Sequence, residues 1–165
     1  MSKAFTGEQD VPDAPQLPLP EGRRPITAHG MAALQRTLRQ ALEVERPPLA
    51  AAAGDDSAAR AQLRALDRRT QGLIALMALC DVVPEAPPVP PKVALGTQVD
   101  VRDDTGKRAS YTIVGPDEID VASHCISCVS PIGRALMGLT VGAWAHIERP
   151  RGVWEVEVVA IAPRA

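Results

Sequence analysis

The sequence predicts an α+β protein in which an antiparallel helical hairpin precedes a small, mostly antiparallel sheet domain with one short helix. Apolar residues recur every three to four positions in the first half, as on one face of a helix, and alternate in the second half, as in a strand. A proline-rich stretch separates the two patterns. We therefore divide the chain into a disordered proline-rich segment (1–25), a coiled-coil hairpin (26–83), a linker (84–91) and the sheet domain (92–165).

Composition excludes several classes of protein. Two Trp, one Tyr and one Phe are too few for a protein that stacks successive bases on aromatic rings. A formal net charge of -2 argues against nonspecific coating of nucleic acid. The sequence has neither a long apolar run nor a signal-peptide pattern, so we expect a cytoplasmic protein without a membrane partner. Three cysteines fit free thiols in a reducing compartment.

The first helix is expected to begin after Thr27, a good N-cap followed by strong helix formers. Pro47 and Pro48 fall inside this helix, and a proline there deletes a hydrogen bond and clashes with the preceding turn, so we expect a kink near Arg46. The apolar residues that recur on its face are Leu34, Leu38 and Leu42.

The second helix is expected to follow a turn at 54–57, where an Asp or Ser provides the N-cap. Its apolar positions follow steps of three and four, which is the spacing of a coiled-coil seam. They are Leu63, Leu66, Thr70, Leu73, Met77 and Cys80. Together the two helices form the predicted hairpin.

In the last segment, strands are expected at 99–101 and 110–114, joined by a turn at 103–106. Ser130 and Pro131 have the composition of a helix start, and Gly138 closes that short helix. The final strand alternates, and its predicted buried face holds Trp154, Val156, Val158 and Ala160.

Three groups of residues are candidates for function. The arginines of the hairpin form either an ordinary solvated face or a basic contact surface. Asp55 and Asp56 at the hairpin tip either cap the second helix or offer carboxylates to a hard cation such as Mg²⁺, which a partner would have to complete. Cys125 and Cys128 have the spacing of half a zinc site, but no second pair lies nearby, so strand packing is favoured. No metal site or active site of its own is predicted.

Five stretches carry a family resemblance. They are VERP at 44–47, GDDS at 54–57, LRALDRR at 63–69, IVGPDEI at 113–119 and SPIGRALMG at 130–138. These stretches resemble the GreA/GreB transcript cleavage factors, with GreB closer, over roughly residues 25–161. The family motif of the C-terminal domain is carried by Ser130, Pro131, Arg134, Ala135, Leu136 and Gly138.

The resemblance implies a factor that regulates transcript elongation by inserting its coiled coil into the secondary channel of bacterial RNA polymerase. An FKBP-like C-terminal domain would dock at the channel rim. The factor would have no cofactor and no catalytic residue of its own: the tip acid Asp55 would help to hold an Mg²⁺ of the polymerase, which hydrolyses the RNA. Partners would be the polymerase and the nascent RNA 3′ end, with DNA reached only through the transcription complex. The residues expected to contact RNA or the channel are Arg46, Arg60, Arg64, Arg68 and Arg69.

Two departures from the family pattern bear on transcript cleavage. The family tip reads Gly-Asp-x-Ser-Glu-Asn, but Ala58 stands at the Glu position here, so only Asp55 matches and Asp56 is an extra acid. Each limb of the hairpin is also about six residues shorter than the resemblance suggests, which shortens the reach by about 9 Å. We therefore expect weak or absent cleavage. The short arm is similar to that of Rnk regulators, and the alternatives are a regulator of that kind or a generic protein-interaction module.

Overall fold

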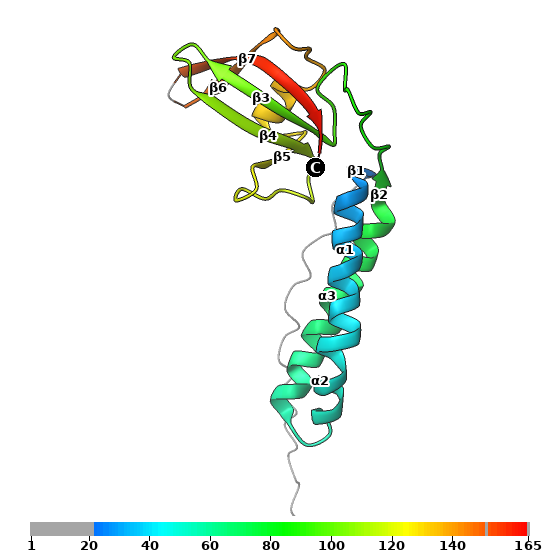
Figure 1. Ribbon diagram of the computed structural model, residues 1–165. Coiled ribbons are helices and arrows are strands. Elements are labelled where there is room, and N and C mark those ends of the chain that lie inside the picture. The colour runs from blue at the N-terminus through cyan, green and yellow to red at the C-terminus, as the bar shows by residue number, and fades with distance from the viewer. Residues whose placement is uncertain (1–21, 151, 165) are drawn as a thin grey trace, which may run out of the picture.

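The computed structural model describes residues 22–150 and 152–164, so most of the N-terminal segment predicted to be disordered lies outside the described residues. An arm of helices extends from a β-sheet that carries one short helix, which makes the protein a mixed α+β structure (Figure 1). The elements in chain order are β1 (Arg24–Ile26), α1 (Ala28–Gln40), the π-helix η1 (Ala41–Glu45), α2 (Arg46–Ala52), α3 (Ser57–Leu79), β2 (Cys80–Val82), β3 (Thr97–Asp103), β4 (Arg108–Val114), β5 (Cys125–Ser127), α4 (Pro131–Leu136), β6 (Trp144–Arg149) and β7 (Gly152–Pro163).

The arm consists of two helical limbs that lie side by side. Helices α1, η1 and α2 form the outgoing limb, and α3 returns along it toward the sheet (Figure 1). Thr27 caps α1 as predicted, because its hydroxyl oxygen accepts a hydrogen bond from the N–H of Gly30 at 3.0 Å. With 23 residues in α3, the arm is about 35 Å long.

A π-helical turn lies at the place where the kink is predicted, near Arg46. The N–H of Arg46 donates to the carbonyl of Ala41, five residues earlier, and Pro47 and Pro48 then occupy the first positions of α2, where their missing N–H groups need no partner in the preceding turn. The seam of this limb continues from Leu38 to Ala41, which is fully buried, whereas Leu42 is 42% exposed and does not belong to the seam as predicted.

The base of the arm contains a small sheet that the sequence analysis did not predict. Helix α3 ends at Leu79, and Cys80, predicted to continue the helical seam, instead opens β2. Strand β2 pairs in parallel with β1, which includes Arg24 and Pro25 from the end of the segment predicted to be disordered. Both limbs therefore start or finish in paired strands where the arm meets the sheet domain.

The sheet domain has a five-stranded sheet in the order β5-β4-β3-β7-β6, antiparallel except between β4 and β5. The turn at 103–106 connects β3 to β4, and Ser130 caps α4, as predicted. Helix α4 lies against one face of the sheet (Figure 1). The buried core consists of Val93, Val99, Val101, Ile113, Leu136, Ala145, Ile147, Val156 and Val158.

A β-bulge corrects the predicted face of the last strand. Asp100 pairs with Ala160 but Val101 pairs with Val158, so Val159 has no partner on β3. The alternation changes phase at this point. Val158 is fully buried, whereas Ala160 is exposed and Ile161 packs against the core instead.

Candidate functional site

The tip of the arm is a tight turn at 53–56, at the end of the arm farthest from the sheet (Figure 1). The N–H groups of Asp55 and Asp56 both donate to the carbonyl of Ala52, at 3.4 and 3.1 Å. These hydrogen bonds provide a partner for the Ala52 carbonyl at the end of α2, and the chain reverses direction before α3 begins. The turn presents two adjacent carboxylates at the narrow end of the molecule.

The two tip carboxylates have different surroundings. Asp56 is the N-cap of α3, and its Oδ1 accepts a hydrogen bond from the N–H of Ala58 at 2.8 Å. The side chain of Asp55 is exposed and bonds to no other residue among those described. The tip therefore offers one uncommitted carboxylate, Asp55, and a second one that already has a structural role.

Arg60, one of the predicted contact residues, completes the tip. Its Nη1 donates to the carbonyls of Ala53 and Gly54, at 3.3 and 3.2 Å. A guanidinium is a suitable donor here because the last carbonyls of a helix carry partial negative charge. Arg60 therefore helps to hold the shape of the turn that carries Asp55.

The five predicted arginines occupy different parts of the arm. Arg46 pairs with Asp67 at 3.0 Å, and Arg69 pairs with both carboxylate oxygens of Glu45 at 3.1 Å, so these two tie one limb of the arm to the other. Such exposed pairs contribute about 0–1 kcal/mol each. The remaining positions, Arg60, Arg64 and Arg68, follow each other at intervals of four residues and share one face of α3.

Metal-binding geometry is absent from the described residues, which contain no group of three or more His, Cys, Asp or Glu side chains able to hold an ion. Cys125 is buried in β5, whereas Cys128 lies just beyond that strand, in the turn that leads to α4. Burial raises the pKa of the Cys128 thiol. A single free carboxylate at the tip could contribute to a metal site only together with ligands from a partner.

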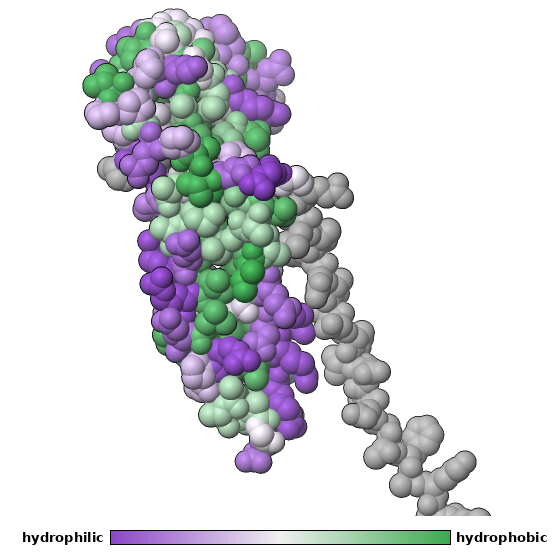
Figure 2. Space-filling model, turned by 90° about the vertical axis from the view of Figure 1, so that its right-hand side faces the viewer, coloured by the Kyte–Doolittle hydropathy of each residue, from purple (hydrophilic) through white to green (hydrophobic). Residues whose placement is uncertain are grey.

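One surface of the arm is apolar. Figure 2 shows a band of apolar residues that runs along this face of the arm between hydrophilic ones. Large apolar side chains of the arm that remain exposed are Leu42, Val44 and Ile74. Exposed apolar surface of this kind is typical of a region that contacts another macromolecule.

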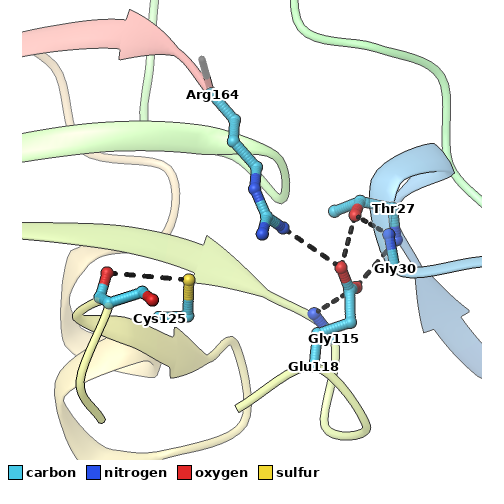
Figure 3. A network of polar contacts seen from close by, with 7 residues as sticks. Thr27, Gly30, Gly115, Glu118, Cys125 and Arg164 are labelled. Carbon is cyan, nitrogen blue, oxygen red and sulfur yellow. Dashed lines mark hydrogen bonds and ion pairs between the residues drawn. The ribbon is translucent and has the colours of Figure 1, made fainter. Parts of the chain in front are cut away.

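The base of the arm holds a buried polar cluster that the sequence analysis missed. Glu118, in the loop after β4, contacts Thr27 at the start of the arm and Arg164 after β7 (Figure 3). Beside it, Arg24 forms a two-pronged ion pair with Asp117, at 2.6 and 2.9 Å. The IVGPDEI stretch marked this loop as distinctive, but nothing in the sequence indicated that its acids pair with residues about 90 positions earlier.

Comparison with known proteins identifies the family. The sequence model described as "Transcription elongation factor, GreA/GreB, C-term" matches residues 88–163. The chain is 35% identical over 152 residues to transcription elongation factor GreB of Pseudomonas aeruginosa, covering 84% of this chain and 90% of that protein. It is also 35% identical to transcription elongation factor GreA of Syntrophobacter fumaroxidans, covering 84% and 97%.

A solved structure is also similar. The crystal structure of Thermus aquaticus Gfh1 is 28% identical, with a TM-score of 0.42, and the match covers 86% of this chain and 99% of that one. None of the helices in the described part of this chain is long and apolar enough to span a bilayer. We base the assignment on the two sequence relatives, whose matches extend over both the arm and the sheet domain: the chain belongs to the GreA/GreB family of transcription elongation factors.

Proposed function

We propose that the protein regulates transcript elongation by binding RNA polymerase, with the arm inside the secondary channel and the FKBP-like sheet domain at the channel rim. The observation that carries the proposal is the family match over 152 residues, which includes the arm as well as the sheet domain. Neither part contains a catalytic residue in this proposal. The protein acts through the enzyme that it binds.

The shape and surface of the arm support this role. An arm of two helical limbs about 35 Å long is slender enough to enter a channel, and it leaves apolar side chains such as Ile74 exposed for a partner to cover. Arg60, Arg64 and Arg68 lie along the returning helix near the tip. In the channel they would face RNA phosphates or acidic walls, which favour guanidinium groups.

The tip favours occupancy of the channel over efficient cleavage. Stabilising the second Mg²⁺ of a two-metal site needs carboxylates aimed at one ion. Here Asp56 is engaged as a helix cap, and Ala58 stands where the family pattern has Glu, so Asp55 alone is available. The short arm also moves that carboxylate about 9 Å back from the expected position, far more than a metal bond of about 2 Å tolerates.

The experiment is a transcript-cleavage assay on purified backtracked complexes with Mg²⁺. Wild type is compared with Asp55→Ala/Asp56→Ala and with Asp104→Ala, which removes an exposed acid of the sheet domain. We expect all three to bind polymerase and to accelerate cleavage by no more than about tenfold over polymerase alone. Rapid cleavage by wild type and Asp104→Ala, lost in the tip variant while binding persists, would contradict the proposal for the tip. Failure of wild type to bind polymerase would overturn the function itself.

A further inference from the structure

We propose that Glu118 is a positioning residue that fixes the direction of the arm relative to the sheet domain. The inference rests on the proposed function only for what the arm is positioned to do. The side chain of Glu118 is 4% exposed, and both of its carboxylate oxygens accept hydrogen bonds from segments that are far apart in the sequence (Figure 3). A buried carboxylate is stable only when it is paired and bonded in this way.

The bonds of Glu118 connect the two parts of the molecule. Its Oε2 accepts from the N–H of Thr27 at 2.8 Å and from the N–H of Gly115 at 3.1 Å. Its Oε1 accepts from the hydroxyl of Thr27 and from Arg164 at 3.2 Å. Thr27 is the residue that begins the arm, whereas Gly115 and Arg164 belong to the sheet domain. One side chain therefore holds the first residue of the arm against two segments of the sheet domain.

The backbone of Arg164 is held in place by a hydrogen bond of its own. Its backbone N–H donates to the carbonyl of Gly96 at 3.0 Å, just before β3. Arg24 and Asp117 add a second connection, because their paired hydrogen bonds join β1 at the arm base to the same loop. These side chains are only 20% and 15% exposed, so the pair is screened less than a surface ion pair.

Two glycines show how closely the surfaces approach. A Cβ placed on Gly30, in the first turns of α1, would lie 2.1 Å from Cδ of Glu118. A Cβ on Gly115 would lie 2.1 Å from the carbonyl oxygen of Pro25. Glycine is unfavourable inside a helix, so its presence at position 30 is explained by the carboxylate that packs directly against it. The arm base has no room to rotate without losing these contacts.

The direction of the arm matters because the arm acts as a lever. A tilt of about 10° at the base would displace the end of a helix of about 35 Å by roughly 6 Å. Such a displacement would move Asp55 and the neighbouring arginines away from any site in a narrow channel. Loss of Glu118 should therefore weaken binding of the protein to polymerase, although the arm and the sheet domain each remain folded.

The test measures the distance between nitroxide labels carried by unnatural amino acids at Ala61 on the arm and Val141 on the sheet domain, both exposed. Glu118→Gln keeps the shape of the side chain, but it removes the charge, and its amide NH₂ faces either Arg164 or the N–H groups of Thr27 and Gly115, so at least one hydrogen bond is lost in each orientation. Gly30→Ala obstructs the carboxylate while it raises the helix propensity of the arm. Glu157→Gln is the matched control, because it removes a distant ion pair with Arg102.

Wild type and Glu157→Gln should give one narrow distance distribution, whereas Glu118→Gln and Gly30→Ala should broaden it by about twofold or more, with unchanged helical circular dichroism. Distributions as narrow as that of wild type in both variants would overturn the proposal. If Glu118→Gln fails to fold, Gly30→Ala decides.

A second readout connects the contact to the proposed function. Glu118→Gln should weaken binding to polymerase by about tenfold, and Glu157→Gln by less than about twofold, because only part of the population then holds the arm in the binding direction. Equal affinities would contradict the positioning role. If wild type does not bind polymerase, the proposed function fails, but the distance measurement still decides the role of Glu118.

Discussion

Gly133 shows how one side-chain atom can affect the stability of the sheet domain. A Cβ at this position in α4 would lie 2.0 Å from the backbone oxygen of Ser127, which cannot move away easily. Gly72, in α3, has nothing within 4 Å of the same added atom. We therefore expect Gly133→Ala to reduce the free energy of unfolding by about 2 kcal/mol or more, and Gly72→Ala to increase it by about 0.4–1 kcal/mol.

Urea unfolding of the two variants measures both effects against wild type. Equal effects of the two substitutions would show that α4 does not lie against the Ser127 backbone as described.

Asp103 makes the stability of the β3–β4 turn depend on pH. The hydroxyl of Thr105 donates to its Oδ1 at 2.6 Å, and this hydrogen bond is the main reason why the pKa of Asp103 is lowered. A group whose pKa is lower in the folded state stabilises the fold above its unfolded pKa of about 3.9 and loses that contribution as the pH falls through the folded value.

Asp103→Asn should therefore have a lower free energy of unfolding than wild type at pH 7. The difference in this free energy between the two proteins should shrink as the pH is lowered to about 3. Thermal unfolding of both proteins across this range is the measurement. A difference that stays constant with pH would contradict the role assigned to the Asp103 carboxylate.

Within the arm, two leucines that were predicted to share the seam differ in burial. Leu66 is 6% exposed in the seam, whereas Leu42 is 42% exposed at the start of the π-helical turn. Leu66→Ala should cost about 2–4 kcal/mol of unfolding free energy, and Leu42→Ala less than about 1 kcal/mol. Similar losses for both would place Leu42 in the seam and contradict its exposed position.

Patterns that repeat were predictable from the sequence, and single-residue irregularities were not. The seam of α3 and the alternation of β7 show up as periods of 3.6 and 2. The π-helical turn at Ala41 and the bulge at Val159 each add one residue to an otherwise regular element. Pro47 and Pro48 marked the first place only as a kink, and no local composition marks the second. Strands β1 and β2 have three residues each, too few to show a period.

At the scale of the whole molecule, the sequence indicated the tip but not the base of the arm. Asp55 and Asp56 lie next to each other, so the turn composition was enough to place them together. Glu118 and Thr27 are 91 residues apart, and only the packing of the arm on the sheet domain brings them into contact. The direction of the arm, on which its proposed use depends, therefore needed the three-dimensional structure.

A competition titration on RNA polymerase measures whether the arm occupies the secondary channel. A fluorescent GreA or GreB cleavage factor is first bound to polymerase. The unlabelled protein is then added in one titration, and its Glu157→Gln control in a separate one. If the arm enters the secondary channel, both unlabelled proteins displace the labelled factor completely, and a single dissociation constant describes each titration. Simultaneous binding of both factors, with the labelled one retained at saturation, would contradict the claim.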